Sequence, residues 1–230
     1  MDQVILPGEP PVSITLRVSR RARRLSLRVS ALDGRVTLTR PHGVSACEAL
    51  DFAREREEWL RGHLARCPGE CRVGHYTAIP YRGNMMRIVP GPGRVANLVD
   101  DTLVVPGDAD AAGQRAMSFL RLAARDRFAE ASDRYAALLG RSFMGITLRD
   151  PRSRWGSCSS RGRLMYSWRL IMAPDAVLDY VAAHEVAHLA EMNHSPRFWA
   201  VVGRLYGDTR APRDWLRREG TALHRFRFAD

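Results

Sequence analysis

The chain contains no lysine, few cysteines and no long apolar run, and these absences limit the kinds of protein that it can be. Because no apolar stretch approaches the roughly 18 residues that a membrane-spanning helix needs, an integral membrane protein is excluded. Four cysteines are too few for a disulfide scaffold and fit a reducing compartment. The segment from Met1 to Ser13 carries acids and three prolines, without a basic flank or an apolar stretch. No secretory signal is therefore expected, and the expected location is the cytoplasm.

The composition is that of an ordinary globular protein. Of the 230 residues, 45% are hydrophobic and 27% are charged, which argues against a largely disordered chain. This length suits one large domain or two small ones.

The net charge of +11 comes entirely from arginine, which accounts for all 36 basic residues. Complete replacement of lysine by arginine indicates a bias in the base composition of the genome. The distribution of arginine along the chain is therefore more informative than its total. One cluster lies in an acid-free stretch between Arg17 and Arg28, and a second lies between Arg141 and Arg169. Such clusters form either solvated faces or a surface that binds an anion, such as nucleic acid.

The pattern of apolar residues predicts an α+β fold. Residues 1–105 are expected to form a β-rich N-terminal region with one helix. Residues 106–230 are expected to form a helix-dominated domain with a small sheet. The predicted strands cover 12–18, 25–29 and 36–38, with a hairpin at Asp33-Gly34, and short strands between 72 and 105, at 143–148 and at 164–172. The predicted helices cover 45–64, 108–139, 175–192, a shorter segment from 195, and 213–226.

The most specific pattern is His184-Glu185-Val186-Ala187-His188, within a predicted helix that begins near residue 175. Residues four apart share one face of an α-helix, so the imidazoles of His184 and His188 can reach one cation. Neutral imidazole nitrogens suit Zn²⁺. Glu185 lies about 100° further round the helix and can reach a water on that metal. This is the general-base position of H-E-x-x-H hydrolases.

A catalytic zinc site also needs a third protein ligand and an open position. His194 can be that ligand only if the helix ends before it, since a continuous helix would place it about 9 Å further along the axis. Asn193 tolerates the left-handed conformation that ends helices, and Ser195 with Pro196 forms an N-cap and first-turn pair. The sequence therefore predicts a break. Glu191, on the ligand face of an unbroken helix, is the alternative third ligand.

A second patch runs from Arg154 to Cys158, Arg-Trp-Gly-Ser-Cys. Its glycine and serine predict a tight loop between two strands. Arg154 and Ser157 are candidate substrate-binding residues, and backbone N–H groups of this segment with the Arg154 guanidinium would polarise a carbonyl or phosphoryl oxygen near the metal. The alternative is a turn packed by Trp155. Cys158 is interpreted as a small buried thiol rather than as a fourth ligand or a nucleophile.

Four further residues recur at intervals of four: His63, Cys67, Cys71 and His75. Their spacing raises the question of a structural zinc. Pro68 and Gly69 prevent one continuous helix from presenting all four, so no metal is expected there.

Taken together, these motifs resemble the YgjP-like family of predicted zinc metallopeptidases, which are relatives of SprT and WLM proteins. The resemblance rests on Val181 to Trp199, on Arg154 to Cys158 with the strand that follows, and on the β segment from Arg23 to Val29. It implies a zincin-type C-terminal half with a small antiparallel sheet and an active-site helix. It also implies His184, His188 and His194 as zinc ligands, with Glu185 as catalytic acid/base.

The leading hypothesis is therefore a zinc-dependent hydrolase of the metallopeptidase type acting on peptide or protein, with Glu185 as general acid/base. A second hypothesis is metal-dependent hydrolysis of a phosphoanhydride, for instance in a nucleotide, with arginines between 141 and 169 binding the phosphates. A third is a metal-stabilised nucleic-acid-binding module without catalysis. SprT relatives act at DNA, so DNA is a further expected partner. No membrane partner is expected.

Overall fold

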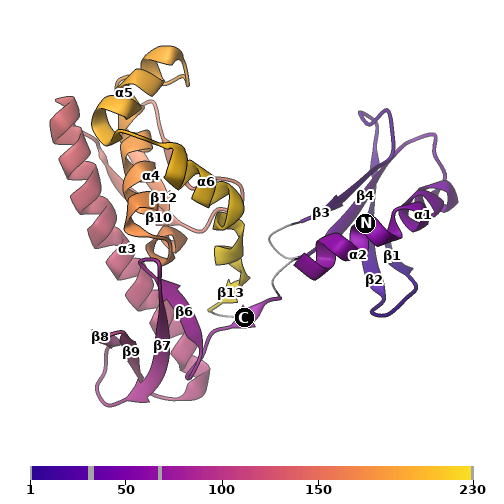
Figure 1. The fold of residues 1–230 in the computed structure, drawn as a ribbon, viewed down its shortest axis with the longest axis horizontal. Coiled ribbons are helices and arrows are strands. Elements are labelled where there is room, and N and C mark those ends of the chain that lie inside the picture. The colour runs from indigo at the N-terminus through magenta and orange to yellow at the C-terminus, as the bar shows by residue number, and fades with distance from the viewer. Residues whose placement is uncertain (1, 31–33, 67–68, 229–230) are drawn as a thin grey trace. The chain divides into compact units, whose positions relative to one another are not determined.

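The computed structural model describes residues 2–30, 34–66 and 69–228 (Figure 1). Its contacts divide the chain into two compact units: unit 1 covers Met1–Glu70 and unit 2 covers Cys71–Asp230. The composition change at Pro106 therefore lies inside unit 2, between strand β9 (Thr102–Pro106) and helix α3 (Ala109–Leu139), which pack against each other. The short strands that precede Pro106 bury their apolar side chains in the same core as α3. The boundary between the two units therefore lies earlier in the chain than Pro106.

Unit 1 contains a four-stranded sheet in the order β1-β2-β4-β3. Strand β2 runs parallel to β4, and the other neighbouring pairs are antiparallel. Strands β3 and β4 form the predicted hairpin, although Asp33 of its turn lies outside the described residues. The first strand was not predicted from the sequence. The strands are β1 (Asp2–Leu6), β2 (Val12–Ser19), β3 (Ser26–Val29) and β4 (Val36–Pro41).

Two helices cover one face of this sheet, where the sequence predicted one. They are α1 (Ala46–Glu55) and α2 (Glu57–Arg66), and the helix is interrupted at Arg56. The predicted capping box is present, since the Ser45 side chain accepts from the Glu48 amide and the Glu48 carboxylate accepts from the Ser45 amide. Apolar residues of alternate strand positions and of both helices form the unit's core.

The first part of unit 2 is a second four-stranded sheet packed against α3. Its order is β6-β7-β9-β8, with β6 (Ala78–Tyr81), β7 (Asn84–Gly91) and β8 (Asn97–Val99). The long helix confirms the predicted limits: the Asp108 side chain caps its start, and Gly140 ends it in the left-handed conformation at φ 67°. Its buried stripe includes Leu120, Ala124 and Phe128.

A three-stranded sheet follows α3, in the order β10-β12-β11. Its strands are β10 (Gly145–Arg149), β11 (Gly156–Cys158) and β12 (Arg163–Ser167). The sheet is mixed rather than antiparallel throughout: β11 is antiparallel to β12, whereas β10 is parallel to it. The chain reverses direction after β10 and again after β11, and β12 lies between these two strands. The strand predicted at 164–172 ends at Ser167 and continues as a 3-10 helix, η1 (Trp168–Met172).

Three more helices complete unit 2; the first packs against β11 of this sheet, and the other two pack against the first. They are α4 (Asp175–Ala187), α5 (Pro196–Tyr206) and α6 (Arg210–Arg218). The helix predicted at 213–226 is instead the end of α6, a 3-10 segment η2 (Gly220–Arg225) and a short strand β13 (Phe226–Arg227), parallel to β5 (Cys71–Arg72). The buried Arg169 side chain fastens this C-terminal segment, because its guanidinium donates to the carbonyls of Leu223 and Phe226 at 2.9 and 3.1 Å.

The architecture is therefore α+β, with small sheets in the first half and mostly helices in the second (Figure 1). Within the described ranges, no helix combines the length and apolar character that crossing a bilayer requires.

Candidate metal centre

Three histidines converge at the C-terminal end of α4. His184 lies in the last turns of α4, His188 directly follows its final residue, and His194 lies in the link to α5. Their ligand nitrogens all lie within 4.8 Å of one another. The Nε2 atoms of His184 and His194 are 3.0 Å apart. Among the described residues, this is the group of His, Cys, Asp and Glu side chains placed to share an ion.

The helix ends before His194, as a shared site requires, but it ends at Ala187 rather than near residue 192, and Asn193 does not end it. Asn193 is absent from the non-glycine residues with positive φ, so it does not adopt the expected left-handed conformation. Instead, the amides of Leu189 and Ala190 donate to carbonyls three residues back and tighten the last turn. The next helix begins at Pro196 as predicted, with the Ser195 side chain accepting from the Phe198 amide.

Main-chain contacts fix the orientation of His188. Its Nδ1 lies 3.0 Å from the carbonyl oxygen of Glu191, so Nδ1 carries the proton and donates to that oxygen. The lone pair of Nε2 is then free to bind a metal. Glu191 therefore contributes through its backbone, and its side chain is not part of the histidine group. Nothing in the sequence pattern predicted this backbone contact.

Aromatic rings pack around the three imidazoles. Phe198 stacks on His188 with a centroid distance of 4.4 Å, and its ring also lies edge-on to His184 and His194. Burial, followed by the neighbouring histidines, lowers the pKa of His184 to about 4. Burial also lowers the pKa of His188. Both imidazoles are therefore neutral near pH 7, which is the form that binds a metal.

This donor set fits zinc. In a tetrahedral site with Zn–N bonds of about 2.0–2.1 Å, neighbouring ligand nitrogens lie about 3.3 Å apart. The His184–His194 separation of 3.0 Å lies close to that value, and no two of the ligand nitrogens are more than 4.8 Å apart. His194 is exposed to solvent, so the centre has an accessible side. Three imidazoles with an open position are typical of catalytic rather than structural zinc.

Glu185 is buried on the neighbouring face of α4, with 6% of its surface exposed. Burial raises the pKa of its carboxyl group to about 8, and the positive charge of Arg154 acts in the opposite direction. The carboxylate packs against Gly156 of β11. A Cβ atom at position 156 would lie 2.6 Å from the Glu185 Oε1.

The segment Arg154 to Cys158 is not the tight loop expected from its sequence, because Gly156–Cys158 form the edge strand β11. The tight turn lies just after it, closed by the Gly162 amide donating to the Ser159 carbonyl. Alternation along the strand places Gly156 and Cys158 on the face towards α4 and Ser157 on the opposite face. The sequence suggested a turn because glycine and serine are poor strand formers, whereas pairing with β12 decides the outcome.

Arg154 and Ser157 line a cavity of about 230 Å³ that opens mainly on that opposite face of the sheet and also reaches Cys158 at the end of β11. Arg149 and Arg163 also line it. Within the described ranges, none of these three guanidinium groups donates to a protein acceptor. Cys158 lies on the Glu185 side, where burial and the Glu185 charge raise the pKa of its thiol to about 11. Cys158 is therefore a neutral thiol and no ligand in the histidine group.

Among the described residues, no group placed to bind a metal includes the predicted set His63, Cys67, Cys71 and His75. The His63 Nδ1 contacts the Trp59 carbonyl in α2, and the His75 Nε2 contacts the Val105 carbonyl. Cys67 lies outside the described residues.

The comparison with known families matches a model described as YgjP-like, metallopeptidase domain, over residues 23–219. No curated protein and no solved structure matches the chain. The match covers most of the chain and includes the three histidines, Glu185 and the β11 segment. The chain therefore belongs to the YgjP-like family, with its match in that family's metallopeptidase domain.

Proposed function

We propose that the protein is a zinc-dependent peptidase in which His184, His188 and His194 hold the metal and Glu185 transfers protons. One observation carries the proposal: a buried carboxylate directly follows the first of three converging imidazoles. Membership of a metallopeptidase family supports an amide as the substrate bond.

His184, His188 and His194 would hold the zinc, which when bound would lower the pKa of a water towards about 7 and polarise a substrate carbonyl. Glu185 accepts a proton from the attacking water as the new C–O bond forms at the amide carbon. It then delivers that proton to the leaving nitrogen as the C–N bond breaks. The carboxylate must begin this cycle deprotonated, and the positive charge of Arg154 favours that form.

Arg154 and Ser157 are the proposed substrate contacts. Arg154 is exposed, lies two residues before the start of β11 and is close enough to Glu185 to influence its charge. Its guanidinium can donate to a substrate carbonyl or carboxylate beside the scissile bond. Ser157 is half-buried on β11 and faces the cavity, on the other side of the strand from Glu185, so its hydroxyl would contact a substrate away from the scissile bond.

The second candidate function is hydrolysis of a phosphoanhydride at the same metal. The observation that favours it is the cavity lined by Arg149, Arg154 and Arg163, whose donors are suited to phosphate oxygens. Peptide hydrolysis remains the first proposal, because Glu185 packs on the α4 side of β11 and the cavity lies on the other side.

Metal analysis combined with a substrate screen tests both candidates. The purified full chain would be analysed for bound metals and assayed on casein, short peptides and nucleoside triphosphates, alongside Glu185→Gln and Glu191→Gln. We expect zinc in all three proteins, peptide hydrolysis by the parent and by Glu191→Gln, and a loss of about 100-fold or more in Glu185→Gln.

The other outcomes of this screen lead to different conclusions. Hydrolysis of triphosphates without peptides would favour the second candidate. Full peptidase activity in Glu185→Gln would reject the proton-transfer role. Protein that binds zinc but hydrolyses nothing would leave a metal-stabilised binding module, the third hypothesis drawn from the sequence.

A further inference from the structure

The sheet of unit 1 has one face that carries only neutral and basic side chains. The apolar residues of β2, β3 and β4 point to α1 and α2, and the alternate residues form the opposite face. In register, Arg17 of β2 and Ser26 of β3 flank Thr39 of β4, and Thr15 and Arg28 flank Thr37. Every side chain in these two rows can donate a hydrogen bond, and none is acidic.

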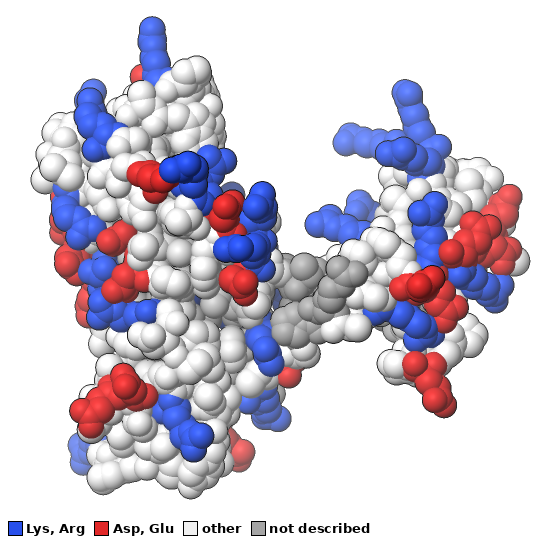
Figure 2. All heavy atoms as spheres, in the orientation of Figure 1, with Lys and Arg blue, Asp and Glu red and all other residues white. Residues whose placement is uncertain are grey.

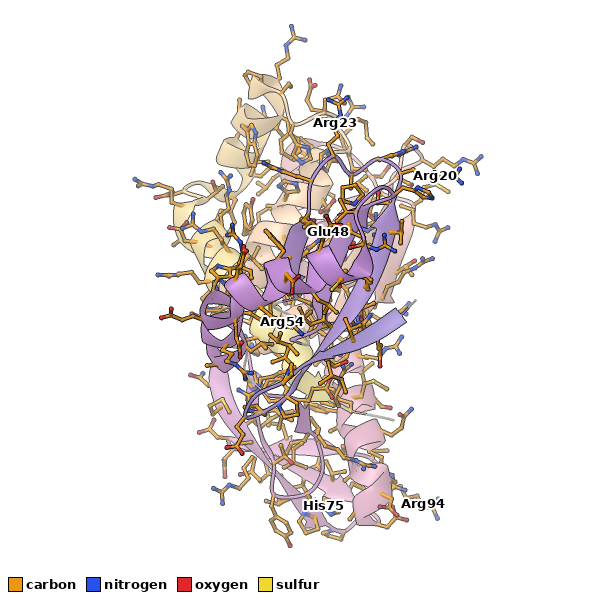
Figure 3. The ribbon with its side chains drawn as sticks, turned by 90° about the vertical axis from the view of Figure 1, so that its right-hand side faces the viewer. Arg20, Arg23, Glu48, Arg54, His75 and Arg94 are labelled. Atoms are coloured by element: carbon orange, nitrogen blue, oxygen red, sulfur yellow. The ribbon has the colours of Figure 1, made fainter. Side chains whose placement is uncertain are left out.

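The loop between β2 and β3 extends this basic surface. It adds four exposed arginines, of which Figure 3 labels Arg20 and Arg23. Within the described residues, none of the loop arginines, nor Arg17 and Arg28, donates to a protein acceptor. We call this set the arginine face: Arg17, Arg20, Arg21, Arg23, Arg24 and Arg28.

Acidic residues of unit 1 are concentrated on the helices that cover the other side of the sheet. These are Glu48, Asp51, Glu55, Glu57 and Glu58. Arginines there are paired, since Arg54 contacts Asp51 at 2.8 Å and Arg61 contacts Glu57 at 2.7 Å. Figure 2 shows basic side chains without acidic neighbours at the top of this unit, and acidic side chains together with basic ones below.

A composition bias alone does not explain this uneven distribution of charge. Such a bias replaces lysine with arginine on both faces of the unit, but it does not remove acidic residues from one of them. Like charges gathered on one face of a unit repel one another, so a surface of this kind is stabilised by an anionic partner.

The chemistry of the face points to phosphates rather than bases. Guanidinium and hydroxyl groups are the usual donors to the oxygens of a nucleic-acid backbone. No tryptophan, tyrosine or phenylalanine occurs before Phe52, so this face offers no ring on which an unpaired base could stack. We propose that the arginine face of unit 1 binds the phosphate backbone of duplex nucleic acid without regard to sequence.

This inference does not depend on the proposed peptidase activity, so its test needs no hydrolysis. Binding of the full chain to a labelled 30-base-pair DNA duplex would be followed by fluorescence anisotropy between 50 and 200 mM salt. With about five phosphate contacts, the affinity should fall several-hundred-fold over that range. A single strand of the same sequence should bind more weakly than the duplex, and Glu185→Gln should bind like the parent.

Two variants of equal charge decide whether the face is responsible. Arg20→Gln with Arg23→Gln removes two charges from the arginine face, and Arg54→Gln with Arg56→Gln removes two from α1 and its end. The first should weaken binding roughly 10- to 60-fold at 0.1 M salt and reduce the salt slope by about 1.8. The second should weaken binding less than about 2-fold.

Several results would overturn the proposal. Equal losses in the two double variants would mean that only total charge matters. Salt-independent binding, a preference for the single strand, or tighter binding to phosphatidylserine vesicles than to the duplex would each contradict duplex recognition by this face.

Discussion

Gly156 and Glu185 contact each other so closely that no side chain fits between them, since a Cβ at position 156 would lie 2.6 Å from the carboxylate oxygen. Strand β11 thereby sets the position of the proposed general base. We expect Gly156→Ala to displace Glu185 and to lower kcat about 100-fold while leaving zinc binding intact, because an error of about 1 Å in a catalytic group has an effect of that size.

The matched control for that change is Gly203→Ala in α5, where a Cβ would meet nothing within 4 Å. This replacement should preserve activity and stabilise the helix by about 0.5–1 kcal/mol. Steady-state kinetics together with zinc content would check the pair. Parent-like kcat in Gly156→Ala would show that the contact does not position the carboxylate.

Replacement of His194 should abolish tight zinc binding. We expect His194→Ala to weaken affinity by more than the roughly 10- to 100-fold typical of residues that only support a ligand. Glu191→Gln should bind zinc like the parent, because the contact of Glu191 with His188 uses the backbone carbonyl. Competition with a chelator of known affinity would measure both. The reverse order of affinities would make the Glu191 side chain the third ligand.

Burial of Glu185 predicts an unusual dependence of stability on pH in the metal-free protein. Its pKa is raised to about 8 from an ordinary value of 4.5, so the folded protein binds this proton more tightly than the unfolded chain. The resulting stabilisation is complete below about pH 4.5 and is lost as pH rises through about 8. Glu185→Gln should therefore gain stability relative to the parent, by up to a few kcal/mol, between pH 5 and pH 9. Thermal unfolding with chelator present would measure it, and a constant difference would contradict the prediction.

His224 should show the opposite trend. Burial, with Arg169 nearby, lowers its pKa to about 4 from 6.5, so the unfolded chain binds this proton more tightly. Stability from this residue is complete above about pH 6.5 and falls as pH decreases towards 4. His224→Gln should remove about 2 kcal/mol of that acid sensitivity, whereas the exposed His42→Gln should not. Urea unfolding at pH 7 and pH 4.5 would compare them, and identical pH dependence in the two variants would refute the assignment.

The grouping of the three histidines could be predicted from local sequence because they lie within eleven residues of one another. The four-residue spacing of His184 and His188 follows from helix geometry, and Ser195 with Pro196 starts a new helix by local capping rules. The family resemblance drawn from these motifs is confirmed by the match over residues 23–219. The end of α4 was harder to predict, because backbone turns after His188 perform the role expected of Asn193.

What could not be predicted depends on contacts between distant segments. Gly156 and Glu185 are far apart in sequence, and no local pattern shows that the Glu185 carboxylate packs against a residue that must be glycine. Pairing with β12 made a strand of a segment whose residues favour turns. The same cause explains β1, β13 and the mixed order β10-β12-β11, since strand partners are chosen by the whole fold.

The C-terminal segment fastened by Arg169 extends beyond the family match, which ends at residue 219. Trp155, the residue before Gly156, packs on the His224 ring with a centroid distance of 5.4 Å. A chain shortened at the family boundary would lose that ring and leave the Arg169 guanidinium without two of its acceptors. Trimming of this tail would thus loosen β11 and inactivate the proposed enzyme without touching a single metal ligand.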